Sequence, residues 1–210
     1  MKELIIIGAG DFGREVFSLA QQSLGYETEF VIKGYLDASY DKLDGFTGYP
    51  PIIGILEDYM PTENDVFVCS ISNTEAKKRC IDAIESKGGN FINIIHKTCL
   101  LNHNVKIGKG IIMGHTVSLG NDTVLKDHIV LNSTIIIGHD VLIGSYCHLN
   151  AFAFMGGFSK LGNGCTMHPH SVLLPKVTVG DNSIIGVGSV VMKNVKADKT
   201  VFGNPAKEIM

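Results

Sequence analysis

Aliphatic residues recur with a period of six through the second half of the chain. From residue 92 to residue 193 the sequence divides without a gap into seventeen units of six residues, and the fourth position of every unit is Ile, Leu, Met or Val. The second position is mostly small or β-branched, and the fifth is glycine in nine units, from Gly108 to Gly186. An internal repeat that keeps one phase over this length indicates stacked structural units.

This period predicts a three-sided parallel β-helix, in which each unit forms one short strand and one corner, and three units complete a coil. The fourth-position side chain is expected to point into the prism, the second to lie where interior space is tight, and the third to face outward. Glycine at the fifth position is expected to supply the unusual dihedral angles of the corner. Seventeen units make between five and six coils.

The pattern of the first ninety residues predicts alternating strands and helices. Buried strands are predicted over residues 4–10, 30–37 and 65–71, and a helix is predicted over residues 14–24. Asn73 is predicted to cap a second helix that stops at the glycine pair of residues 88–89. This alternation indicates a small parallel α/β sheet.

We therefore predict an α/β Rossmann-like half domain followed by a parallel β-helix. The predicted boundaries are residues 1–90 for the Rossmann-like domain, residues 91–195 for the β-helix, and residues 196–210 for a C-terminal tail.

Three glycines, Gly8, Gly10 and Gly13, follow the first predicted strand with the spacing G-x-G-x-x-G. They would let the backbone approach a diphosphate at the positive end of the following helix. Asp37 ends the second predicted strand, which suits an acid that bonds ribose hydroxyls. The alternative is that the glycines only permit tight packing of strand and helix. A dinucleotide domain normally needs about twice as many strands, so this half domain favours a nucleotide-linked substrate over NAD.

Two histidines stand apart from the other six. His139 lies at a corner of the repeat and is followed directly by Asp140, so a carboxylate could hold the imidazole in one tautomer and leave its other nitrogen free to take a proton. His148 occupies a third position, from which it would face a neighbouring subunit or a ligand along the helix. Most corner histidines are expected to be solvated or bonded to a neighbouring turn.

The order of IIIGAGDFGREV, an uninterrupted hexapeptide repeat and a terminal GNPAKEI resembles one family over essentially the whole chain. This is the sugar acetyltransferase family that includes the bacillosamine-pathway nucleotide-sugar N-acetyltransferase and the sialic acid O-acetyltransferases. The resemblance implies a left-handed β-helix, acetyl-CoA as cosubstrate, a nucleotide-sugar acceptor in surface glycan synthesis, and a homotrimer whose sites are each shared by two subunits.

The resemblance also implies roles for particular residues. The stretch GHDVLIG, residues 138–144, matches the family's G-H-[DE]-x-x-I-G segment, so His139 would be the general base and Asp140 its orienting acid. His148 matches a second histidine that contacts the acetyl-CoA thioester or the substrate. One coil further on, the pair Gly156–Gly157 is the candidate oxyanion donor beside acetyl-CoA, although it is equally compatible with an ordinary turn.

Lys207, within the terminal GNPAK motif, is a candidate contact for a phosphate of CoA; a solvated lysine in a tail is the alternative reading.

Composition narrows the function classes. The chain is 45% hydrophobic and 19% charged with a net charge of −3, so no basic excess points to nucleic acid. The N-terminal apolar run is too short for a signal peptide or a membrane span. Five cysteines without a C-x-x-C pair indicate reduced thiols in a cytoplasmic protein.

Three alternatives stay open. O-acetylation of a sugar of the sialic acid type would use the same base with another acceptor pocket. A zinc hydratase on the same helix would need three converging imidazoles; the closest pairs are His168/His170 and His139/His148, so no metal is expected. A non-catalytic nucleotide-binding scaffold would have no use for the His139–Asp140 pair.

Overall fold

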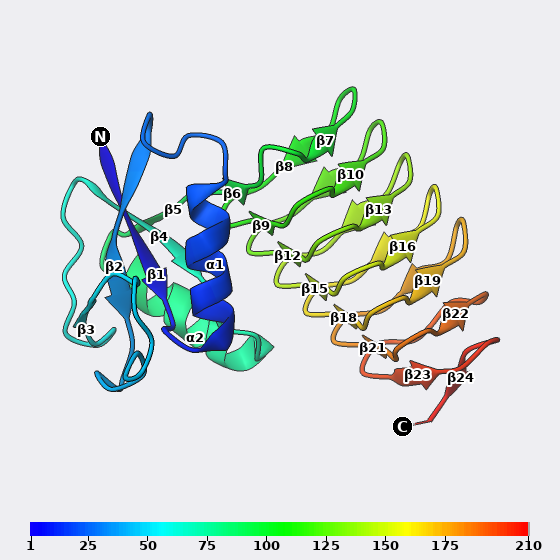
Figure 1. The fold of residues 1–210 in the computed structure, drawn as a ribbon. Helices are drawn as coiled ribbons and strands as arrows, with labels where there is room; N and C mark the ends of the chain where they lie inside the picture. The colour runs from blue at the N-terminus through cyan, green and yellow to red at the C-terminus, as the bar shows by residue number, and fades with distance from the viewer. Residues whose placement is uncertain (210) are drawn as a thin grey trace. The chain divides into compact units, whose positions relative to one another are not determined.

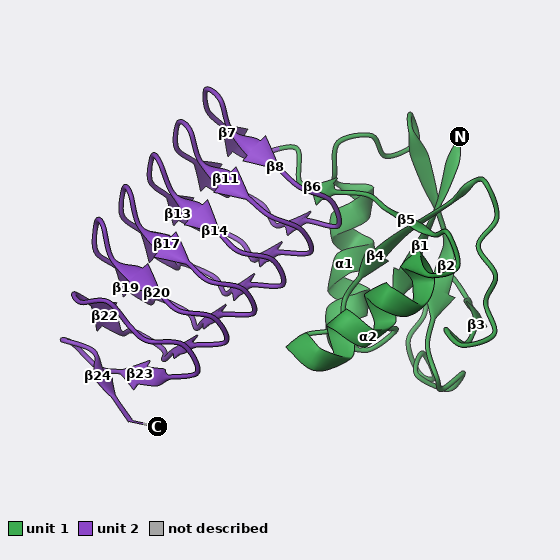
Figure 2. Cartoon of the chain, turned by 180° about the vertical axis from the view of Figure 1, so that it is seen from behind, with its two compact units in different colours: residues 1–97 green, residues 98–210 purple. Residues whose placement is uncertain are grey.

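The computed structural model describes residues 1–209. Its contacts divide the chain into two compact units, Met1–Lys97 and Thr98–Met210 (Figure 2). The structure thus divides the chain after Lys97, whereas the sequence pattern placed this boundary after residue 90. The residues from 196 onward, which were predicted to form a separate tail, belong to the second unit.

The first unit is a five-stranded parallel sheet with the strand order β3-β2-β1-β4-β5 (Figure 1). Its strands are β1 (Lys2–Ile7), β2 (Phe30–Leu36), β3 (Ile52–Gly54), β4 (Asp65–Cys69) and β5 (Asn90–Phe91). The helices α1 (Asp11–Gln21) and α2 (Thr74–Glu85) cover opposite faces of the sheet, and β6 (Ile94–Ile95) follows. The predicted Rossmann-like parallel sheet is confirmed.

Both helices begin at signals in the sequence. The side-chain oxygen of Asn73 accepts a hydrogen bond from the Ala76 amide at 2.9 Å, which confirms the predicted cap of α2. Helix α1 starts at Asp11 with Gly10 as its N-cap, earlier than the predicted start at Arg14. An acidic residue in the first turn is favoured by the helix dipole, and this explains the earlier start.

The second unit is a parallel β-helix whose two-residue strands stack coil upon coil (Figure 1). The first face comprises β7 (Leu100–Leu101), β10 (Ser118–Leu119), β13 (Ile136–Ile137), β16 (Phe154–Met155), β19 (Val172–Leu173) and β22 (Val190–Val191). The second comprises β8 (Lys106–Ile107), β11 (Val124–Leu125), β14 (Leu142–Ile143), β17 (Lys160–Leu161) and β20 (Thr178–Val179). The third includes β9 (Ile112–Met113), β12 (Val130–Leu131), β15 (His148–Leu149), β18 (Thr166–Met167), β21 (Ile184–Ile185), β23 (Thr200–Phe202) and β24 (Lys207–Glu208).

The register confirms the repeat derived from the sequence. Neighbouring strands pair residues eighteen apart, as Ile136 pairs with Phe154, so three hexads complete one coil. Fourth-position side chains are at most 2% exposed from Met113 to Val191, whereas Leu101 in the first coil is 38% exposed. The fold is the left-handed β-helix that the resemblance implied.

The expected role of the fifth-position glycines is wrong. Positive φ angles occur instead at first positions, such as Asp140 (φ 55°) and Phe158 (φ 61°). A Cβ on Gly120 would lie 2.5 Å from the carbonyl carbon of Gly138 in the next coil. Glycine is therefore required there because successive coils approach closely.

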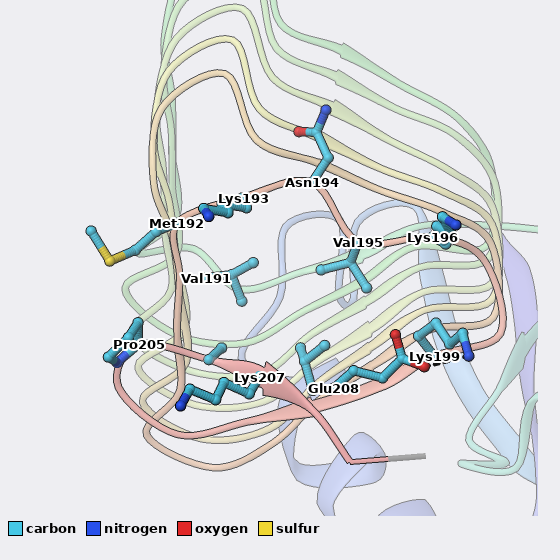
Figure 3. Close-up of a pocket in the computed structure, with 12 residues that line it drawn as sticks. Val191, Met192, Lys193, Asn194, Val195, Lys196, Lys199, Pro205, Lys207 and Glu208 are labelled. Carbon is cyan, nitrogen blue, oxygen red and sulfur yellow. Dashed lines mark ion pairs between the residues drawn. The ribbon is translucent and has the colours of Figure 1, made fainter.

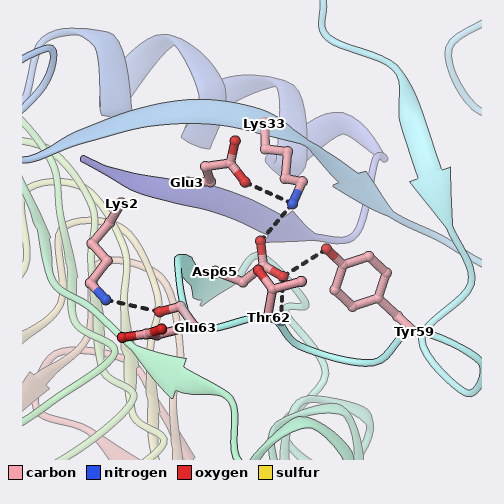
Figure 4. Close-up of polar contacts among 7 residues, drawn as sticks. All are labelled: Lys2, Glu3, Lys33, Tyr59, Thr62, Glu63 and Asp65. Carbon is pink, nitrogen blue, oxygen red and sulfur yellow. Dashed lines mark hydrogen bonds and ion pairs between the residues drawn. The ribbon is translucent and has the colours of Figure 1, made fainter.

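A buried carboxylate holds three elements of the first unit together (Figure 4). The Asp65 side chain is fully buried and accepts hydrogen bonds from Lys33 Nζ (2.7 Å), Tyr59 Oη (2.9 Å) and the Thr62 amide (2.7 Å). Lys33 also pairs with Glu3 at 2.8 Å. Burial opposes ionisation of Asp65, but these hydrogen bonds outweigh it and lower the pKa of the carboxyl.

Replacement of Lys33 by methionine is expected to destabilise the protein by about 3 kcal/mol, because it leaves the buried Asp65 carboxylate without its cation. The lowered pKa means that stabilisation is present above the unfolded value of about 3.9 and is lost as pH falls through the folded value. Protonation of Asp65 removes the unpaired charge, so the variant's loss of stability relative to the wild type should be largest near neutral pH and should shrink as the pH falls through the acidic range. Thermal unfolding across acidic pH measures both effects. Lys2→Met is the control, since the Lys2 ammonium donates to an exposed backbone carbonyl, that of Glu63, at 2.9 Å; equal shifts for both variants would contradict the prediction.

No helix within residues 1–209 is long and apolar enough to cross a membrane. None of the five cysteines forms a disulfide within residues 1–209. Burial raises the pKa of Cys69 to about 12 and also raises that of Cys80, so neither thiol is activated.

Candidate active site and nucleotide-binding loop

His139 and Asp140 form a polar pair at the corner between β13 and β14. The Nδ1 atom of His139 lies 2.8 Å from Asp140 Oδ2, so the shorter aspartate does reach the imidazole. With the Nδ1 proton donated to the carboxylate, Nε2 is the nitrogen that can accept a proton. The two side chains are 59% and 40% exposed. The pair is open to a substrate from outside the prism.

Gly157 lies directly beneath this imidazole, one coil further on. A Cβ on Gly157 would lie 2.7 Å from His139 Nε2, so only glycine leaves room for the ring in this position. The ring of Phe158 meets the imidazole edge-to-face, with centroids 5.1 Å apart. Sequence reasoning missed Phe158, although its place eighteen residues after Asp140 would have put it at this corner.

Backbone amides at the next corner of the prism are capped by side chains from the following coil. The amide-to-acceptor distances lie between 2.8 and 3.3 Å for the pairs Lys109–Asp127, Asp127–Ser145, Ser145–Asn163 and Asn163–Asp181.

The His139 corner lacks this ladder. The side chain of Asn121 caps the His103 amide at 3.2 Å, but the next positions are His139, Gly157 and Pro175. Within residues 1–209, the Gly157 amide donates to no protein acceptor, whereas the Gly156 amide donates to the Leu173 carbonyl at 2.9 Å. Of the predicted glycine pair, Gly157 offers the free backbone donor beside His139.

His148 does not join His139 within one chain. It lies on β15, in the third face of the prism, while His139 lies at the corner between the other two faces. The half-buried His148 ring lies with its Nε2 atom 3.3 Å from the side-chain nitrogen of Asn132, which donates to Asn150 at 3.2 Å. Counting hexads in threes along the sequence would have revealed this separation.

Lys207 lies on β24 at the C-terminal end of the β-helix, about three coils from the His139 corner. It lines a pocket of about 820 Å³ together with the valines of the last coil and three other lysines (Figure 3). Lys199 at this pocket is paired with Glu208.

The three glycines of the first unit have different roles. A Cβ on Gly13 would lie 2.1 Å from the Gly8 carbonyl oxygen, and one on Gly8 (φ 98°) would lie 2.8 Å from Ile71. These two glycines permit close packing of strand, loop and helix. A Cβ on Gly10 would meet nothing within 4 Å, so the loop is open at this residue. Gly10 provides no side-chain cap to α1, and the first turn is available to an anion.

Asp37 is brought to this glycine loop. Its two carboxylate oxygens accept hydrogen bonds from the Ala9 amide at 2.8 Å and the Ser39 amide at 3.1 Å. Ser70, which sequence reasoning missed, donates to the Ile7 and Gly8 carbonyls at 2.7 and 2.9 Å. Its position at the end of β4, beside β1, was the available signal, because ligands bind parallel sheets where the strand order reverses.

Among residues 1–209, no three His, Cys, Asp or Glu side chains converge as a possible metal site.

A different protein family matches a segment of each unit. Residues 3–84 match the family described as PglD N-terminal domain, and residues 158–193 match the bacterial transferase hexapeptide family (six repeats). Putative acetyltransferases of Staphylococcus aureus are 45% identical over 40 residues, so the chain spans only 20% of the length of these curated relatives. GDP-perosamine N-acetyltransferase of Escherichia coli O157:H7 is 26% identical over 97% of this chain and 95% of its own.

Solved structures share the fold over the whole chain. The acetyltransferase domain of PglB from Neisseria gonorrhoeae FA1090, in complex with acetyl coenzyme A, has a TM-score of 0.88 at 24% identity and covers 99% of both chains. PerB from Caulobacter crescentus, in complex with CoA and GDP-perosamine, has a TM-score of 0.88 at 21% identity and covers 100% of this chain and 98% of its own. The chain thus joins a segment that matches the PglD N-terminal domain family to one that matches the bacterial transferase hexapeptide family, on a fold that it shares over its whole length with these solved structures.

Proposed function

We propose that the protein transfers an acetyl group from acetyl-CoA to the amino group of a nucleotide-linked sugar. The observation that carries this proposal is the His139 imidazole, oriented by Asp140 and lying over the free amide of Gly157. Support also comes from the similar E. coli protein, which is a GDP-perosamine N-acetyltransferase, from the PglB domain in complex with acetyl coenzyme A, and from PerB in complex with CoA and GDP-perosamine.

In the proposed reaction, His139 Nε2 takes a proton from the substrate amine as the amine nitrogen attacks the thioester carbon. The tetrahedral intermediate carries a negative oxygen, which the Gly157 amide stabilises by donating a hydrogen bond. Collapse of the intermediate breaks the carbon–sulfur bond, and the departing thiolate receives the proton held by His139. The products are CoA and the N-acetylated sugar, with no other reactant required.

The first unit would hold the nucleotide part of the acceptor. Gly10 leaves the start of α1 open for the diphosphate, while Gly8 and Gly13 set the loop against the sheet. Asp37 lies at the end of β2 with each carboxylate oxygen holding a single backbone donor, so it can also accept from ribose hydroxyls.

A second copy of the chain would complete the site, in a homotrimer. His148 lies on the face opposite the His139 corner, so it reaches a His139 site only across a subunit boundary. The face that contains β13 and β16 exposes Leu100, Ile136 and Phe154, apolar side chains that a neighbouring copy would cover. Acetyl-CoA would lie along the groove between copies, with Lys207 near its phosphates, and these substrates suit a cytoplasmic enzyme.

Thiol release from acetyl-CoA, measured with a panel of nucleotide-linked amino sugars and free sialic acids, tests the proposal. Turnover with an amino sugar and acetylation at nitrogen, seen by mass spectrometry, are expected. Turnover only on hydroxyl acceptors would make the protein an O-acetyltransferase. If no acceptor releases thiol while nucleotide sugars still bind, the protein is a nucleotide-binding scaffold and the proposal is wrong.

A further inference from the structure

Arg14 has an unusual environment for a charged residue in the first turns of a helix. Its side chain is only 16% exposed, and Nη2 lies 2.6 Å from the carboxylate of Asp11, which is 97% exposed. The guanidinium carbon lies 3.7 Å above the ring of Phe46. The cation is therefore held between a carboxylate and an aromatic face, close to the start of α1.

Phe46 belongs to the loop that connects β2 to β3, and this loop begins immediately after Asp37. A second contact from the same loop, between Tyr49 and Phe17 of α1, has a centroid distance of 5.3 Å. Two aromatic residues thus lay the loop along α1, and one of them fixes the plane of the Arg14 guanidinium. The ring of Phe46 is itself 48% exposed.

A negative charge, on Asp11, and a positive charge, on Arg14, lie together in the first turns of α1. The open first turn after Gly10 attracts an anion, but Asp11 places a negative charge beside it. A diphosphate would be repelled by Asp11 alone, and Arg14 neutralises that repulsion. Within residues 1–209, one bond from Arg14 to Asp11 is its only side-chain hydrogen bond, which leaves further donors of the guanidinium for an incoming oxyanion.

We propose that Arg14 binds the diphosphate of the nucleotide-linked substrate, with Asp11 as the anion it holds beforehand and Phe46 as the ring that keeps its guanidinium in plane. This inference rests on the proposed function of the glycine loop. Arg14 would be the cation that binds the diphosphate, and the β2–β3 loop would be part of the nucleotide site through Phe46.

Isothermal titration of the full chain with UDP and GDP, and with uridine and guanosine, tests this role. Arg14→Met should lower the affinity for whichever of UDP and GDP binds more tightly by about tenfold or more, while the affinity for the corresponding nucleoside stays the same. Arg14→Lys should be intermediate, because it keeps the charge but loses the planar fork. Asp11→Asn added to Arg14→Met should recover part of the loss, because the repulsion is then removed. Arg79→Met, at an exposed arginine of α2, is the matched control.

The outcomes separate this inference from the function on which it rests. If the wild type binds a diphosphate and Arg14→Met binds it equally well, the role of Arg14 is wrong and the nucleotide site stands. Equal loss of nucleoside and diphosphate affinity would assign Arg14 a purely structural role and would also overturn the inference. If the wild type binds no nucleoside diphosphate at all, the nucleotide site and the role of Arg14 both fall.

Discussion

Replacement of His139 by alanine is expected to lower kcat for acetyl transfer by about 10²–10⁴-fold, because the substrate amine then loses its proton acceptor. The fold should be unaffected, since the His139 side chain is 59% exposed at a corner and the Phe158 ring that it meets in the next coil is itself 50% exposed. Thiol release under saturating substrate measures the effect, and thermal unfolding verifies that the chain is folded.

His103→Ala is the matched control for this variant. His103 occupies the same position of the hexad at the same corner, two coils earlier, and it is exposed. Its loss should leave turnover unchanged. Equal losses in both variants, or full activity in His139→Ala, would remove His139 from the mechanism. Coexpression of His139→Ala and His148→Ala chains then asks whether two copies share a site, since only a shared site lets mixed oligomers regain activity.

Replacement of Gly157 by alanine is expected to lower kcat by about 10²-fold, close to the effect of losing an oxyanion donor. The added Cβ would lie 2.7 Å from Nε2 and 2.8 Å from Cε1 of His139, so the imidazole must move away from the reacting amine. Thermal stability should change little, because the atoms that must shift are at the end of one exposed side chain.

Gly138→Ala provides the contrast. Its Cβ would lie 2.7 Å from the Gly157 nitrogen and 3.0 Å from the Met155 carbonyl oxygen, which are backbone atoms of the next coil. This variant should lower the unfolding midpoint, since stacked coils cannot separate locally without breaking their ladder. A Gly157→Ala protein that is as active as the wild type would show that turnover does not depend on the position that Gly157 leaves open for the imidazole.

The hexapeptide period contained most of the information about the second unit. One aliphatic residue in six, in constant phase, predicts both the eighteen-residue register and the buried fourth position, because an inward side chain on each short strand suffices to build the core. The same period did not reveal why glycine follows the aliphatic residue. The reason is the distance between coils, as between Gly120 and Gly138, and a pattern along the chain does not measure that distance.

The glycine loop shows a similar division. The sequence showed both its spacing after a strand and the acid that ends the next strand, and the structure brings that acid, Asp37, to the Ala9 amide of the loop. Which glycines serve packing and which one leaves open space depends on the residues opposite each Cα. Ile71 and the Gly8 carbonyl make that decision, and only the folded sheet brings them there.

By itself, the sequence determined the order of the two folds, the register of the coils, the His139–Asp140 pair and the glycine loop, because each depends on spacing along one strand, turn or helix. Only the tertiary structure decided that the His139 ring turns toward Gly157 and that Phe46 covers Arg14. These relations join residues from different coils or from a helix and a distant loop. They are contacts between residues far apart in the sequence, and the hydrophobic packing of the whole unit determines which of these residues meet.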